Sequence, residues 1–144
     1  MVNILNLETI NCFFRCGDRC CVDATKARYS LVELENLAKT TDQFTFINMF
    51  MGRIVALTGS SVGFIYKAST DNTTSYKALA SIGISVNESI LTKNILNIPL
   101  HYQGAFVGTL GLGLRTRSVN IDAFLDRLEG LIGLLSRYIH EHSF

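Results

Sequence analysis

The sequence contains no tryptophan, a single proline and no cysteine after residue 21. Its formal net charge is only +1 over 144 residues, so it lacks the basic excess that binds nucleic-acid backbones. No apolar run approaches the roughly 20 residues of a membrane-spanning helix, and the opening "MVNILNLETI" lacks the basic segment of a signal peptide. We therefore expect a soluble, intracellular (cytoplasmic) protein that binds neither nucleic acid nor membranes.

The four cysteines all fall within the stretch "CFFRCGDRCC" and are Cys12, Cys16, Cys20 and Cys21. A reducing compartment disfavours disulfides, and this spacing differs from the two separated close pairs of most zinc sites. Reduced cysteine packs as a small hydrophobe, and Phe13 and Phe14 lie between the cysteines, so packing is the favoured interpretation. A metal site is one alternative, and a reactive thiol favoured by Arg15 and Arg19 is the other.

Capping signals predict two helices before the first strand. Ser30 and Glu33 form the capping-box pattern of a helix that begins at residue 30. Thr40 and Gln43 repeat the pattern for a second helix, and Gly59 suits the C-terminal end of that helix.

The middle of the chain changes to a period-two pattern that predicts two β-hairpins. The four strands are expected at residues 62–68, 76–83, 94–102 and 105–115. In the last strand, bulky side chains alternate with small ones, so one face is bulky and the other small. We expect helices to cover the bulky face and a close neighbour, either a ligand or another part of a chain, to lie against the small face.

A final helix is expected at residues 121–142, with an apolar stripe wider than one sheet face requires. Gly130 and Gly133 cost helix stability, which makes sense where another helix comes close. The sequence thus predicts an α+β fold, with an antiparallel sheet and N- and C-terminal helices packed on one face. We divide the chain into an apolar, cysteine-rich leader, residues 1–29, that packs on or beside a single domain, residues 30–144.

Two motifs in this domain resemble the GAF domain family. The stretch "IVALTGSSVGFIYKA", residues 54–68, is similar to the family's junction between the first core helix and the first strand. The stretch "NIPLHYQGAFVGTLGLGLR", residues 97–115, is similar to its second half. The resemblance covers residues 30–142 and implies a GAF/profilin-like sheet, but the fold by itself names no ligand. A roadblock or longin-like fold is the structural alternative.

The chain departs from the GAF family where ligand-binding members build the wall and lid of their pocket. Only residues 84–94 separate the two hairpins, which is too short for that lid. We expect residues 4–22 to cross the vacant sheet face or to pair with a second subunit. Any reduced pocket would lie over the small face, and its candidate residues are Tyr66, Tyr76, His101, Thr109 and Gly111.

No catalytic motif is recognisable in the sequence, so we expect neither enzymatic activity nor a cofactor. His140 and His142 stand two residues apart near the end of the chain, where we expect a fraying, solvated terminus.

The favoured hypothesis is a non-catalytic, regulatory or signalling module that scaffolds protein interactions. The GAF resemblance implies a homodimer through the first and last helices, and a different protein partner is also possible. The candidate interface residues are Phe44, Ile47, Met51, Ile54, Leu128, Gly130, Leu131, Gly133, Leu135 and Tyr138. The alternatives are a small-molecule sensor with a reduced pocket and a redox or metal-binding protein that uses the four cysteines.

Overall fold

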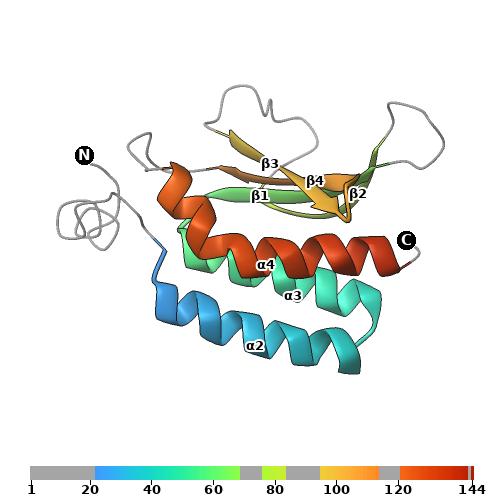
Figure 1. Cartoon of the computed structure of the whole chain (residues 1–144), viewed down its shortest axis with the longest axis horizontal. Helices are drawn as coiled ribbons and strands as arrows, with labels where there is room; N and C mark the ends of the chain where they lie inside the picture. Colours follow the sequence, from blue (N-terminus) through green and yellow to red (C-terminus); the bar gives the residue numbers. More distant parts are fainter. Residues whose placement is uncertain (1–21, 69–75, 84–94, 114–120, 143) are drawn as a thin grey trace.

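The computed structural model describes residues 22–68, 76–83, 95–113, 121–142 and 144. In this part of the chain, four antiparallel strands form one sheet and three helices lie on one side of it (Figure 1). The elements in chain order are α2 (Ala24–Thr40), α3 (Gln43–Thr58), β1 (Val62–Ala68), β2 (Tyr76–Ile82), β3 (Ile95–Tyr102), β4 (Ala105–Gly113) and α4 (Ile121–Glu141). The predicted α+β class, with the helices packed on one face, is confirmed.

Helix α2 begins before the residue that the capping signals indicated. Its N-cap is Asp23, whose side chain accepts hydrogen bonds from the backbone N–H groups of Thr25 and Lys26, at 2.8 and 3.1 Å. Ser30 lies inside the helix and is buried, so its predicted capping role was wrong. Because Asp23 already satisfies the first free N–H groups, the helix extends over residues 24–29.

Helix α3 also has an aspartate as its N-cap. The Asp42 side chain accepts hydrogen bonds from the backbone N–H and the hydroxyl of Thr45, at 2.8 and 3.1 Å. Thr40 is the last residue of α2, so its predicted capping role was wrong as well. At the other end Gly59 has a φ of 65°, a left-handed conformation that glycine adopts without strain, and it ends α3 as predicted.

The strand order in the sheet is β2-β1-β4-β3. The two predicted hairpins, β1–β2 and β3–β4, are confirmed, and β1 and β4 pair antiparallel at the centre. Ile65 pairs with Leu110, which pairs in turn with Ile98, so one row of branched side chains crosses three strands. The edge strand β3 contains Pro99, while β2 forms the opposite edge.

The helices form two further layers beneath the sheet (Figure 1). Helices α3 and α4 contact the strands, and α2 packs across α3 and α4 on the side away from the sheet. Between α2 and α4, the Leu31 side chain lies against Gly130, where an added Cβ would be 2.8 Å from Leu31 Cδ2. Arg127 of α4 donates a hydrogen bond of 2.8 Å from Nη1 to the Val22 carbonyl, which joins the start of the described chain to α4.

Candidate functional site

The sheet face turned away from the helices carries three of the residues that were predicted to line a reduced pocket, namely Tyr66, Thr109 and Gly111. On this face the Phe64 ring lies directly over Gly111 of the neighbouring strand, so that a Cβ at position 111 would overlap it. The Tyr66 ring lies beside that of Phe64, with 4.9 Å between the ring centroids. Phe64 is only 4% exposed. The close neighbour predicted for the small face is therefore a side chain of this same protein.

The same arrangement repeats two residues along the strands. Val62 pairs with Gly113 as Phe64 pairs with Gly111, and a Cβ at Gly113 would overlap the Val62 side chain. The side chains of Val62 and Phe64 are both buried. The glycines of β4 thus make room for side chains of β1.

The structure brings together some of the predicted pocket residues. Tyr66 and Thr109 are direct cross-strand partners, and Gly111 follows two residues later on the same strand. His101 is exposed farther along β3, where it pairs with Phe106 and the two ring centroids are 5.6 Å apart. Tyr76 pairs with Ala68 in the ladder, but its side chain lies outside the described part of the chain, as do residues 84–94.

Most of the predicted interface residues are buried within the single chain. Seven of them are at most 3% exposed, namely Ile47, Met51, Ile54, Leu128, Leu131, Leu135 and Tyr138. They pack in the core between the helices and the sheet, so they do not form a surface for a second copy. Of the remaining three, Phe44 is 76% exposed, Gly130 faces Leu31, and Gly133 is exposed with no described atom within 4 Å of its Cβ position.

The apolar stripe of α4 is wide because this helix contacts two layers. One side of α4 packs on β3 and β4, and another side packs on α2. The close approach of a helix that Gly130 indicated does occur, but the helix is α2 of the same chain. Helix α2 of the same chain therefore covers the part of the α4 stripe around Gly130, and the homodimer through the first and last helices stays a prediction.

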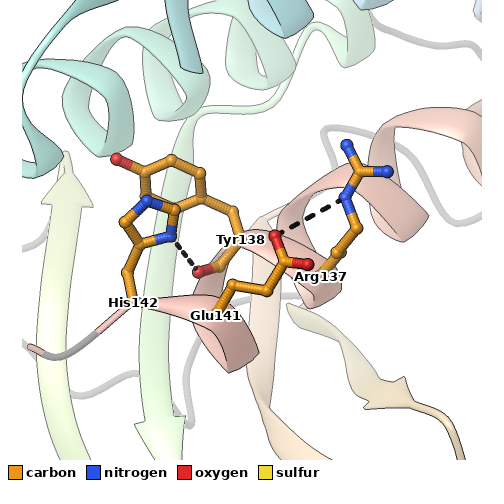
Figure 2. Close-up of polar contacts among 4 residues, drawn as sticks. All are labelled: Arg137, Tyr138, Glu141 and His142. Atoms are coloured by element: carbon orange, nitrogen blue, oxygen red, sulfur yellow. Dashed lines mark hydrogen bonds and ion pairs between the residues drawn. The ribbon is translucent and has the colours of Figure 1, made fainter. Parts of the chain in front are cut away.

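An aromatic cluster occupies the C-terminal end of α4, as Figure 2 shows in part. The Tyr138 ring stacks on Phe46 at 4.0 Å and on His142 at 3.9 Å, measured between ring centroids. His142 Nδ1 lies 2.9 Å from the Tyr138 carbonyl oxygen (Figure 2). The ring of His140 is 4.9 Å from that of Tyr102. Helix α4 continues to Glu141 and His142 stacks on Tyr138, so the predicted fraying was wrong, whereas His140 is exposed as predicted. The four-residue spacing of Tyr138 and His142 is the sequence signal that could have found the contact.

At this end of the molecule, the charge at the start of α3 acts on a side chain of α4. Burial raises the pKa of Tyr138, and the negative charge of Asp42 raises it further. The hydrogen bonds that Asp42 accepts from the backbone and hydroxyl of Thr45 lower the pKa of its carboxyl group. Asp42 is therefore a cap whose charge also acts on the stacked tyrosine.

A hollow of about 540 Å³ lies between α2 and α3, and sequence reasoning gave no sign of it. Its lining consists of Asp23, Thr25, Lys26, Tyr29, Ser30, Arg53, Ala56 and Leu57. Arg53 forms an ion pair with Glu33 of α2, and this contact lowers the pKa of Glu33 and raises that of Arg53. Because a carboxylate already engages Arg53, the hollow is a mixed-charge depression with an aromatic rim and not a ready anion site.

The described residues contain no group of three or more His, Cys, Asp or Glu side chains placed to hold a metal ion. Among the helices that the structure describes, none is long and apolar enough to cross a membrane. All four cysteines lie outside the described part of the chain, so the packing, metal and thiol interpretations stay predictions.

Comparisons with known proteins return no match, whether to a family model, a curated protein or a solved structure. The GAF resemblance therefore stays a prediction, while the α+β class rests on the structure itself.

Proposed function

We propose that this chain is a non-catalytic, GAF-like domain that acts as a protein-interaction module. The observation that carries this proposal is the filling of the sheet face by Phe64 and Val62, each set over a glycine of β4. A small-molecule site needs a concave space that encloses most of its ligand. At the predicted position of the pocket, the aromatic ring of Phe64 takes up that space.

The exposed apolar side chains of the helical layers support a polypeptide as the partner. Tyr29 and Val32, one turn apart on α2, are 71% and 55% exposed, and Met49 of α3 is 38% exposed. Aromatic side chains and methionine are enriched in the cores of protein interfaces, where each buries a large area.

The order of the elements supports the GAF-like part of the proposal. A helix leads into a hairpin, a second hairpin follows, and a last helix returns to the same side of the sheet. The predicted lid region, residues 84–94, lies outside the described residues, as do residues 1–21 of the predicted leader, whereas residues 24–29 belong to α2. The cysteine-based alternative rests entirely on that leader.

Native mass spectrometry of the untagged, reduced full-length chain tests this function. We expect peaks that correspond only to the bare 16.0 kDa chain or its multiples. A retained small molecule or metal ion would overturn the proposal and direct attention to the sheet face or to the four cysteines. Phe64→Ala provides a second readout, because removing the ring opens the predicted pocket. A small aromatic compound should bind this variant and not the wild type, whereas equal binding to both would contradict the filled face.

A further inference from the structure

Two exposed apolar side chains stand one turn apart on the outer face of α2. Tyr29 is 71% exposed and Val32 is 55% exposed, although the other side of α2 packs on α3 and α4. The hollow between α2 and α3 borders Tyr29 and adds Ala56 and Leu57 to this apolar area. Tyr29, Val32 and the hollow form the outer α2 surface. Large apolar side chains that gather on one surface mark a place where another segment of polypeptide packs.

The chain enters the described fold beside this surface. Val22 is 1% exposed, and its carbonyl accepts the hydrogen bond of 2.8 Å from Arg127. The next residue, Asp23, caps α2 and lines the hollow. The residues that precede Val22 therefore start from a fixed point, at the end of α2 where the hollow lies.

The sequence before Val22 contains the apolar segment "ILNLETINCFF", residues 4–14, which lies outside the described part of the chain. Phe14 stands eight positions before Val22, a link that spans up to about 26 Å. The axial distance from the start of α2 to Val32 is only about 12 Å. Gly17 lies within the link and permits a tight turn. The segment is therefore long enough to return alongside α2 as far as Val32.

The charges at the outer α2 surface complement those of the segment. Lys26 and Arg28 are exposed beside the tyrosine of this surface. The carboxylate of Glu33 on the same helix is paired with Arg53. Glu8 is the only charged residue of the segment. A single acidic side chain in an apolar segment is complementary to a basic rim and fixes the register of the contact.

The outer face of the sheet offers less exposed apolar area to the same segment. Phe64, the large side chain at its centre, is only 4% exposed. The cross-strand row of Phe64 continues to Ser81 on one side and through Gly111 to Asn97 on the other. Ser81 and Asn97 are polar and exposed. An apolar segment therefore removes more apolar surface from water on α2 than across this row.

We propose that residues 4–14 fold back over the outer α2 surface and cover Tyr29 and Val32. This inference rests on the proposed interaction function and names the regulation of its surface. The segment takes the place of a polypeptide partner within the same chain, so an outside partner binds only after the segment is displaced. The apparent affinity for that partner is then reduced by the fraction of chains in which the surface is open.

A tryptophan at position 32 tests the proposal in the reduced full-length chain, because the sequence contains no other tryptophan. The fluorescence of Val32→Trp should move to longer wavelength when Phe13→Glu and Phe14→Glu are added, since the indole ring then meets water. Acrylamide should also quench this fluorescence more strongly. Tyr29→Trp should respond in the same way, which keeps the test valid if one variant fails to fold.

Gly133→Trp and Asn97→Trp are the controls. Gly133 is exposed on the charged face of α4 with no described atom within 4 Å of its Cβ position, and Asn97 is exposed on the outer face of the sheet. Their emission should not depend on Phe13 and Phe14. A folded Val32→Trp variant that does not respond to the two glutamates would overturn the proposal, as would a response of Asn97→Trp in its place.

Crosslinking gives a second readout, because the described residues contain no cysteine and Cys12 lies within the segment. In Val32→Cys, a short bismaleimide should join position 32 to a native cysteine of the same chain, whereas Gly133→Cys should not form such a product. Absence of the product in Val32→Cys, or a product that joins two chains, would overturn the proposal. Either failure would leave the proposed interaction function intact, since Tyr29 would then be open to an outside partner, whereas a retained small molecule would overturn that function.

Discussion

The Phe64 ring on β1 lies against the backbone of Gly111 on β4 and takes the place of any side chain at position 111. The two residues are direct cross-strand partners, so the β1–β4 pairing fixes this contact. The contact therefore depends on the absence of even a methyl group at Gly111.

We expect Gly111→Ala to lower the free energy of unfolding by roughly 1–3 kcal/mol, because the added methyl group overpacks the site beside Phe64. Urea unfolding followed by circular dichroism measures the change. Gly133→Ala is the control, since an exposed helical glycine with open space around it should gain up to about 1 kcal/mol. Equal stability of Gly111→Ala and the wild type would contradict the filled sheet face.

Two phenylalanines near the start of α3 should respond very differently to truncation. Phe46 is fully buried and stacks on Tyr138, whereas Phe44 is 76% exposed. Phe46→Ala should lower the free energy of unfolding by roughly 3–5 kcal/mol. Phe44→Ala should change it by less than about 0.5 kcal/mol. Thermal unfolding of both variants distinguishes them, and similar losses would show that Phe44 is buried in solution.

The cap of α3 should contribute to the acid sensitivity of the fold. The pKa of Asp42 is lowered by its hydrogen bonds with Thr45, so its carboxylate form stabilises the folded state. That contribution is present above the unfolded-state value of about 4 and is lost as the pH falls through the lower folded-state pKa. Asp42→Ser keeps a capping oxygen without a titrating group.

Urea unfolding between about pH 2 and 5 tests this prediction, since that range brackets the ordinary pKa of aspartate. The Asp42→Ser variant should lose less stability on acidification than the wild type. The free energy of unfolding of the variant should still decrease as the pH falls, because the pKa of Glu33 is lowered as well. Identical pH dependence in the two proteins would show that the cap is not formed in solution.

The stability of the protein at alkaline pH should depend on the ionisation of Tyr138. Its pKa is raised by burial and by Asp42, so the folded state favours the neutral phenol. Stability should therefore fall as the pH rises above about 10, the ordinary value for tyrosine. Tyr138→Phe removes the titrating hydroxyl and should reduce this fall. Unfolding measured at about pH 9–11.5 checks the prediction, and an unchanged alkaline slope would contradict it.

Local patterns predicted the order of elements because each one concerns neighbouring residues. The period-two stretches located the strands, and Gly59 marked the end of α3. The start of α2 was missed because two plausible caps stand seven residues apart. Asp23 takes that role, while Glu33 of the predicted capping box pairs with Arg53 on another helix.

The candidate site was harder to predict because it depends on which segments meet in space. The breadth of the α4 stripe was read correctly, but sequence alone does not say whether α2 or a second subunit covers it. The small residues of β4 likewise indicated a close neighbour without identifying it as Phe64.

The contact between Val22 and Arg127 has a consequence for the synthesis of the chain. These residues are 105 positions apart, so α2 leaves the ribosome long before α4 exists. At about 5–20 residues per second, the interval is roughly 5–20 s. During that time the inner face of α2, including Leu31, lacks its partner on α4. Chaperones that shield apolar helix surfaces can bind α2 during this interval. The packing of α2 on α4 forms only after α4 has been synthesised.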